Sequence, residues 1–202
     1  GRILPLSHRD FRDLREQGRA FAGLAGTSMD AYSLGLGTHG ERVFGEMVTG
    51  SYFEVLGVQA SLGRTLLPSD DVSPGKHPVV VISDALWRRA FASDPQIVGK
   101  TIQVNAYPLT IVGVTEPGFQ GSIVSLRMDL YVPVMMQPQL RGFDLLAARE
   151  SPLIWGLGRV RPDSSISAAA EEVDLLSGRL DAGQPARRVA QRATVLPMWS
   201  SP

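Results

Sequence analysis

The motif Gly50-Ser51-Tyr52-Phe53-Glu54-Val55-Leu56-Gly57-Val58 lies a quarter of the way along the 202-residue chain. Its aromatic and aliphatic side chains recur near helical spacing, and Gly57 follows at the place where a glycine ends a helix. The motif therefore predicts a short helix whose large side chains, Tyr52, Phe53 and Leu56, fill a hydrophobic core.

The residues before this motif predict a helix followed by a β-hairpin. Ser7 can accept a hydrogen bond from the backbone N–H three residues on, and Asp10 lies in the first turn, where the helix dipole favours an anion. The helix is expected to continue to Phe21 and to end at two glycines. Its apolar positions and closing glycines are Phe11, Leu14, Phe21, Gly23 and Gly26. Within residues 31–48, apolar residues alternate with other residues on both sides of a turn at residues 38–41, and this pattern predicts the hairpin.

The residues after the motif predict further strands and two helices. One helix is capped by Ser83 and runs through Phe91. The other is capped by Ser165 and has Ile166, Ala169, Val173, Leu176 and Leu180 on one face. Strands are expected at residues 79–82, 101–104, 107–114, 129–133, 153–160 and 188–196. This order predicts an α+β fold in which the middle of the chain is an insertion.

Composition excludes several classes of function. The chain has 20 basic and 20 acidic residues and no cysteine. Charge balance argues against a nucleic-acid binder and against a polybasic membrane patch. The lack of cysteine excludes disulfides, thiolate chemistry and iron–sulfur clusters, but it does not fix the compartment. The longest uncharged stretch, residues 101–115, is 15 residues long, whereas a membrane-spanning helix needs about 20 apolar residues.

Two glycine motifs and the histidines do not predict a ligand site. Residues 35–40 fit G-x-G-x-x-G, but the following residues predict a strand, where a dinucleotide site requires a helix. Gly99-Lys100-Thr101 resembles the end of a phosphate-binding loop, but it too precedes a predicted strand. His8, His39 and His77 have no second ligand at metal spacing, and Asp70-Asp71 is expected to be a solvated loop pair. Acid–base chemistry by scattered carboxylates stays open, because it leaves little sequence signature.

Several segments, in order and at the right spacings over residues 5–197, resemble the MacB-like periplasmic core domain of ABC transporter permeases. Residues 50–58 are similar to its G-N-Y-F-x-V-L-G-V segment, with Ser51 in place of asparagine. Residues 110–121 are similar to T-V-V-G-V-x-P-x-G-F-x-G. Other matching segments are residues 63–66, 78–83, 86–91, 94–105, 129–133 and 158–162. Asp163 departs from the family pattern, in which glycine is common at this turn.

The residues that carry the resemblance are interpreted as structural. They are Tyr52, Phe53, Leu56, Gly57, Gly63, Arg64, Trp87, Phe91, Gly99, Asn105, Gly113, Val114, Pro117, Phe119, Gly121 and Pro133. Arg64 is expected to form an ion pair with Asp70 or Asp129 rather than to contact a ligand. No catalytic, cofactor-binding or metal-binding residue is predicted.

The resemblance implies a two-lobed, non-enzymatic domain outside the cytoplasmic membrane. A membrane-proximal βα lobe would comprise residues 1–50 plus 151–202, and residues 51–150 would form an inserted mixed α/β lobe. Transmembrane helices of the same permease would flank the chain, and ATP would be hydrolysed by a separate cytoplasmic ATPase domain or subunit. The full transporter is expected to be a dimer and the isolated domain a monomer, with a periplasmic protein as a further partner.

Three functions remain open at this point. The first is transmission of an ATP-driven movement to a substrate for efflux or to a periplasmic partner. The second is a regulatory scaffold that activates a bound cell-envelope enzyme, as in FtsX-like relatives. The third, a stand-alone enzyme, would require a cleft with convergent carboxylates of perturbed pKa.

Overall fold

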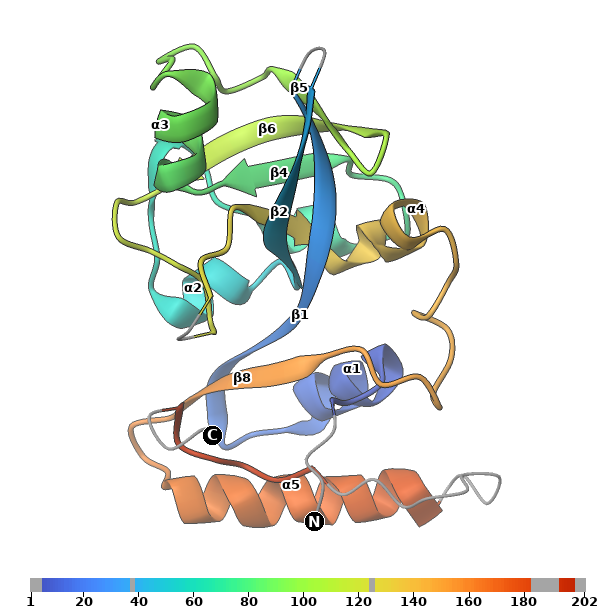
Figure 1. The fold of residues 1–202 in the computed structure, drawn as a ribbon. Coiled ribbons are helices and arrows are strands. Elements are labelled where there is room, and N and C mark those ends of the chain that lie inside the picture. Colours follow the sequence, from blue (N-terminus) through green and yellow to red (C-terminus); the bar gives the residue numbers. More distant parts are fainter. Residues whose placement is uncertain (1–4, 37–38, 124–125, 183–192, 199–202) are drawn as a thin grey trace. The chain divides into compact units, whose positions relative to one another are not determined.

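The computed structural model describes residues 5–36, 39–123, 126–182 and 193–198. The chain forms two compact units. The terminal unit comprises Gly1–Leu24 and Leu145–Pro202, and the central unit comprises Ala25–Asp144. Helices and strands are mixed along the chain (Figure 1), which confirms the predicted α+β class.

The elements of the central unit follow one another as short strands and helices. They are β1 (Phe21–Leu36, whose first residues belong to the terminal unit), β2 (His39–Val48), α2 (Tyr52–Leu56), β3 (Ala60–Gly63), η1 (Pro68–Asp71), β4 (Val79–Ile82), α3 (Asp84–Phe91), β5 (Thr101–Val104), β6 (Tyr107–Thr115), β7 (Leu130–Pro133), η2 (Val134–Met136) and α4 (Gln137–Arg141).

Six strands of the central unit close into a ring in the order β1-β2-β7-β4-β6-β5. The long hairpin of β1 and β2 is antiparallel, β2 pairs with β7 in parallel, and β4 pairs with β6 in parallel. The ring closes where Leu34 and Gly35 of β1 pair with Val104 and Gln103 of β5. Closure removes the exposed strand edges that would otherwise invite pairing with other chains. β3 pairs with the end of β6 outside the ring.

Alternation along the strands fills the ring with apolar side chains. Tyr32 and Leu34 of β1 and Val43 and Met47 of β2 are all buried, while Phe44, between them in sequence, is exposed. This period of two is what a strand with one covered face requires. Further buried residues of the ring strands are Val80, Val81, Ile82, Ile102, Val104, Leu109, Ile111, Leu130 and Val132.

The terminal unit contains α1 (His8–Gln17), β8 (Trp155–Val160) and α5 (Ile166–Ala182). Ser7 caps α1 as predicted, since its hydroxyl accepts from the Asp10 N–H at 3.1 Å. Ser165 caps α5 in the same way, through the Ala168 N–H at 3.0 Å. α1 packs against α5. The buried side chains of the two helices include Phe11, Leu14, Ala169, Val173 and Leu176, whereas Ile166 is exposed and Leu180 is half-buried.

Two predicted elements are wrong in extent. The first helix ends at Gln17 rather than at Gly26, because the Gly18 N–H caps the Leu14 carbonyl and the Ala20 carbonyl then accepts from the Arg161 N–H. The chain therefore enters a strand ladder where a helix was expected. For the strand expected at residues 188–196, residues 188–192 lie outside the described part. Residues 193–196 form no strand, and the Ala193 N–H bonds to the Ser177 hydroxyl instead.

The hairpin is confirmed, but its first strand, β1, begins at Phe21, ten residues before the predicted start. The short helix that ends at Gly57 and the other predicted strands and helices agree to within a few residues, whereas β3, η1, η2 and α4 were not predicted. Residues 25–50 group with the central unit, because β1 and β2 are strands of its ring. The division into a lobe of residues 1–50 plus 151–202 and an inserted lobe of residues 51–150 stays a prediction. In the described part of the chain, no helix combines the length and the apolar character that a bilayer crossing demands.

Candidate functional site

Four aromatic rings gather where α2 meets β7. Tyr52 and Phe53 come from α2, Phe119 from the segment after β6, and Tyr131 from β7. All pairs among them have ring centroids between 5.2 and 6.4 Å apart. These separations are typical of attractive edge-to-face and tilted ring pairs. We call these four rings the aromatic cluster.

A fully buried carboxylate, Glu46 of β2, lies beside the aromatic cluster and pairs in register with Tyr131. The Tyr52 hydroxyl donates to Glu46 Oε2. The Ser122 N–H and hydroxyl both donate to Glu46 Oε1, at 3.0 and 2.6 Å. Burial raises the pKa of Tyr52, and the adjacent Glu46 raises it further, so this hydroxyl stays a donor. A buried carboxylate without such donors would be strongly destabilising.

The Glu46 network joins three separate segments of the central unit. β2 supplies the acceptor, α2 supplies one donor, and the loop of residues 117–122 supplies the others. Gly121 in this loop has φ +101°, and a Cβ there would lie 2.6 Å from Met128 Cγ. Only glycine fits both the backbone and the space. The motifs at residues 50–58 and 117–121 are therefore parts of one packed site.

Arg64 and Asp70 form a bidentate ion pair, with Nη1–Oδ2 2.6 Å and Nη2–Oδ1 3.0 Å. Asp70 also accepts the Leu67 N–H at 2.8 Å. Burial favours the neutral acid, but these donors outweigh it and hold the pKa of Asp70 below its ordinary value. Of the two partners expected for Arg64, Asp70 is therefore the one the structure gives, and the pair is structural.

Asp129, the other expected partner, pairs with Arg89 of α3 instead, at 3.1 Å between Nη2 and Oδ2. The same guanidinium reaches Glu41 of β2 at 2.8 Å. The hydrogen bond that Arg89 donates to Asp129 raises the pKa of Arg89. This three-residue contact ties α3 to the start of β7 and to β2.

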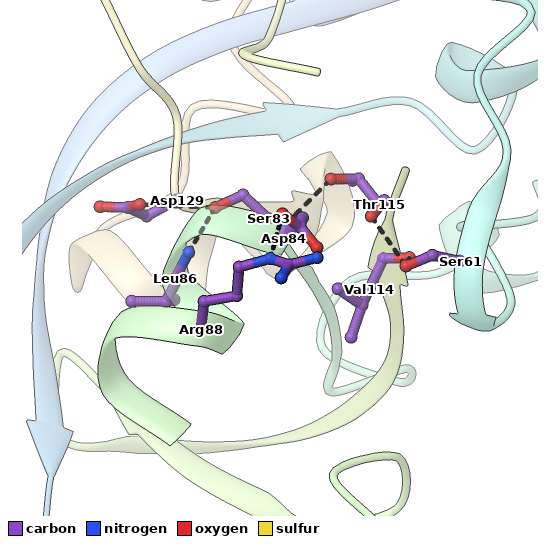
Figure 2. A network of polar contacts seen from close by, with 8 residues as sticks. All are labelled: Ser61, Ser83, Asp84, Leu86, Arg88, Val114, Thr115 and Asp129. Atoms are coloured by element: carbon purple, nitrogen blue, oxygen red, sulfur yellow. Dashed lines mark hydrogen bonds and ion pairs between the residues drawn. The ribbon is translucent and has the colours of Figure 1, made fainter. Parts of the chain in front are cut away.

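Figure 2 shows the contacts of the start of α3 with the end of β6 and with Asp129, the residue before β7. The Ser83 hydroxyl accepts from the Leu86 N–H at 3.0 Å, as the sequence predicts for an N-cap, and lies 3.4 Å from Asp129. The Asp84 N–H donates to the Thr115 hydroxyl, and its carboxylate binds Arg88 at 2.8 Å. Ser61 of β3 donates to the Thr115 carbonyl at 3.0 Å. These are helix-capping and strand-end contacts.

Asn105 closes the strand ring. It occupies the β5–β6 turn with φ 50°, and Ala106 follows with φ 62°, as in a two-residue hairpin turn of type I′. Its N–H donates to the Ser33 carbonyl, and its Oδ1 accepts from the Ser33 N–H, both at 2.8 Å. Its Nδ2 donates to the Leu140 carbonyl at 2.8 Å. Asparagine therefore suits both the backbone and the contacts here.

The other signature residues lie at element ends or in packing positions. The Trp87 indole N–H donates to the Asp94 carbonyl at 2.9 Å. At Gly113 an added Cβ would lie 2.1 Å from the carbonyl oxygen of Arg64, the residue after β3, so the two backbones approach too closely for a side chain. Val114 and Pro133 are buried, Leu56 and Phe91 are half-buried, and Pro117 is exposed; Gly57, Gly63 and Gly99 have positive φ.

The two glycine motifs lie where the sequence placed them. Gly35 and Gly40 pair across the β1–β2 hairpin, and Gly99 and Lys100 directly precede β5. Neither opens a helix that could bind a phosphate. Among the residues that the structure describes, no group of three histidine, cysteine or acidic side chains is placed to hold a metal ion.

Sequence reasoning missed Glu46 and Ser122. The available signal was an acidic residue in a run of strand residues that are otherwise mostly apolar or glycine, Val43 to Val48. A charge in such a run indicates either an exposed edge or a specific buried partner. The partners come from residues 52 and 122, and only the folded structure brings them together.

Comparison with known proteins gives a consistent result. The family model of the MacB-like periplasmic core domain matches residues 2–176. The periplasmic region of MacB from Actinobacillus actinomycetemcomitans superposes with a TM-score of 0.66 at 19% identity, covering 89% of this chain and 75% of that one. No curated protein matches the sequence.

Two further solved structures have the same fold. The extracellular domain of the noncanonic ABC-type transporter YknZ from Gram-positive bacteria gives a TM-score of 0.69 at 16% identity, covering 96% of this chain and 90% of that one. A permease domain from Porphyromonas gingivalis gives 0.61 at 16% identity, covering 88% and 72%.

Proposed function

This chain belongs to the family of MacB-like periplasmic core domains, and from that membership we propose that it transmits ATP-driven movement to the outside of the membrane. As a periplasmic or extracellular domain of an ABC-type transporter permease, it contains none of the transporter's membrane helices among its described residues. The movement would act either on a substrate for efflux or on a periplasmic partner protein.

The location that we propose is the periplasmic face of the bacterial cytoplasmic membrane. Transmembrane helices of the same permease would flank the chain on both sides, and a cytoplasmic ATPase domain or subunit would drive them. Two copies would face each other in the full transporter. The observation that carries the proposal, besides the family, is that residues 1–24 and 145–202 form one compact unit. A unit built from both chain ends can receive motion from two helices and move as one body.

The proposal is tested by distance measurements on the full-length permease with its ATPase in lipid nanodiscs. The chain has no cysteine, so the Ala168→Cys substitution gives the domain a single position at which a thiol-reactive spin label can attach. The label on α5 should change its distance to the same position in the second copy when ATP replaces an ATP-free state. An unchanged distance, with ATP hydrolysis intact, would contradict the proposal.

A second candidate function is regulation of a bound cell-envelope enzyme. It is favoured by exposed apolar side chains on the central unit, among them Phe44 at 41%, Phe143 at 57% and Val72 at 66% exposure. Apolar side chains that form one contiguous exposed patch mark a site of protein contact, and these three are the ones that a docking partner would bury. The variant Phe44→Asp/Phe143→Asp should keep the ATP-driven distance change but lose the envelope-related activity of the full transporter if docking is the role. If both readouts are unchanged, the regulatory role loses its support.

A further inference from the structure

One carboxylate on α5 binds the backbone at the end of the α1 segment. Glu172 Oε1 and Oε2 accept from the Arg19 N–H at 2.9 and 3.0 Å, and Oε2 accepts from the Ala20 N–H at 2.8 Å. Hydrogen bonds to an ionised acceptor are among the stronger ones in proteins. Glu172 therefore fixes two consecutive peptide groups that are about 150 residues away in sequence.

These peptide groups lie on the first of the two connections between the units. The chain passes from the terminal to the central unit at Leu24 and Ala25, a few residues after Ala20. The Ala20 carbonyl also accepts from the Arg161 N–H at 3.0 Å. The segment that leads to the first connection is thus bonded both to α5 and to Arg161, the residue that follows β8.

The second connection has a matching contact. The chain returns to the terminal unit at Asp144 and Leu145. Four residues later, Arg149 Nη1 binds Asp10 Oδ1 at 2.9 Å and Asp13 Oδ2 at 2.7 Å, both on α1. The three side chains are mostly buried, with 24%, 4% and 16% of their surfaces exposed. Partial burial protects such an ion pair from the screening that weakens exposed pairs.

From these two contacts we infer that Glu172 and Arg149 are clamps that fasten both connections to the terminal unit, so that movement of α1 and α5 passes to the central unit. Glu172 holds the first connection and Arg149 the second. Each clamp joins the N-terminal part of the terminal unit, residues 1–24, to its C-terminal part, residues 145–202. Without the clamps, the apolar packing of α1 on α5 would remain, but each connection would be free to move by itself. This inference rests on the proposed function and specifies the residues through which it acts.

The first measurement tests the clamps in this chain. Glu172→Gln keeps the size of the side chain but replaces one acceptor oxygen by an NH₂ group. Hydrogen exchange of the Arg19 and Ala20 amides should become about tenfold faster or more. Glu171→Gln is the matched control, since Glu171 is the preceding, exposed residue of the same helix. Arg149→Met keeps the apolar stem and tests the second clamp independently if one variant fails to fold.

The second measurement tests transmission in the full-length permease with its ATPase. One spin label is placed on α5 at Ala168→Cys and, in a separate sample, one on the central unit at Lys76→Cys, each measured against a label in the membrane part. In Glu172→Gln and Arg149→Met, ATP should move the α5 label as in the wild type, while the shift of the Lys76 label should fall by more than half.

The outcomes separate the two proposals. If the Lys76 label shifts equally in the wild type and in both variants, the clamp inference is overturned while the proposed function stands. If the α5 label does not respond to ATP in the wild type, the proposed function fails and the inference fails with it. Equal amide exchange in Glu172→Gln and Glu171→Gln would also overturn the clamp at Glu172.

Discussion

A carboxylate with no exposure to solvent needs hydrogen-bond donors in place of water, and the donors to Glu46 come from only two residues. The Tyr52 hydroxyl satisfies one oxygen, and Ser122 satisfies the other. The neighbouring Tyr131 hydroxyl is equally buried, but it has no hydrogen-bond partner within the described part of the chain. Of the two tyrosines in the aromatic cluster, therefore, Tyr52 uses its hydroxyl to stabilise a buried carboxylate, whereas the Tyr131 hydroxyl is buried without a partner among the described residues.

This difference predicts that the same substitution destabilises the protein at residue 52 but not at residue 131. Tyr52→Phe leaves Glu46 short of a donor and should lower the free energy of unfolding by about 1–3 kcal/mol. Tyr131→Phe removes an unsatisfied hydroxyl and should be neutral or slightly stabilising. Urea denaturation of both variants beside the wild type provides the measurement. Similar losses for the two would show that the Glu46 network is not what distinguishes these side chains.

The Arg64–Asp70 pair predicts a pH dependence of stability. The pKa of Asp70 is lowered in the folded protein, because its donors offset the cost of burial. A carboxylate with a lowered folded pKa stabilises the protein above its unfolded pKa of about 3.9, and this stabilisation is lost as pH falls through the folded value. The stability gap between wild type and Asp70→Asn should therefore be constant from pH 7 to about pH 5 and shrink below about pH 4. A gap that persists undiminished at pH 3 would contradict this assignment.

At the scale of single elements, the β5–β6 turn connects local geometry to ring closure. Asn105→Gly keeps the positive φ but removes the side-chain hydrogen bonds to Ser33 and Leu140, and should cost about 1–2 kcal/mol of unfolding free energy. Asn105→Ala loses the same bonds and also strains the backbone, by roughly 1 kcal/mol more. Chemical denaturation separates the two terms. Equal stability of the glycine variant and the wild type would mean that the side-chain bonds do not contribute.

The sequence predicts best those helix ends that are determined by residues within one helical turn. Ser7, Ser83 and Ser165 each cap a helix through an N–H three residues ahead, and Gly57 ends α2 in the left-handed region. The helix predicted to reach Gly26 fails for a non-local reason. The residues after Gln17 are held by Glu172 and Arg161, which lie more than 140 residues away. Nothing near Phe21 in sequence carries that information.

The same limit applies to the candidate site. The sequence identifies the segments at 50–58 and 117–121 as signature motifs, but not the Glu46 carboxylate that joins them. Asp70 and Asp129 were both open as partners of Arg64, because the choice depends on where β7 and α3 lie. The local sequence identifies the residues that have a structural role, such as Tyr52, Arg64 and Gly121. The order of the strands determines which residues they contact.

At the scale of the whole molecule, the strand ring decides which part of the chain can fold alone. All six ring strands, except the first residues of β1, lie within residues 25–144. A segment of residues 51–150, the lobe expected from sequence, lacks β1 and β2. It would leave β7 without its parallel partner and β5 without its contact to β1, which exposes two strand edges and the apolar side chains that β1 and β2 cover.

We therefore expect a polypeptide of residues 25–144 to fold by itself and one of residues 51–150 to fail. The longer piece should unfold cooperatively on heating, with dispersed amide resonances, since it contains a closed sheet and its own core. The shorter piece should aggregate or give a broad, non-cooperative transition. If 51–150 folds as well as 25–144, the hairpin of β1 and β2 is dispensable, and ring closure is not what holds the central unit together. Independent folding of residues 25–144 would also mean that the central unit needs no contact with the terminal unit to keep its structure. The clamps at Glu172 and Arg149 would then move the central unit as one body.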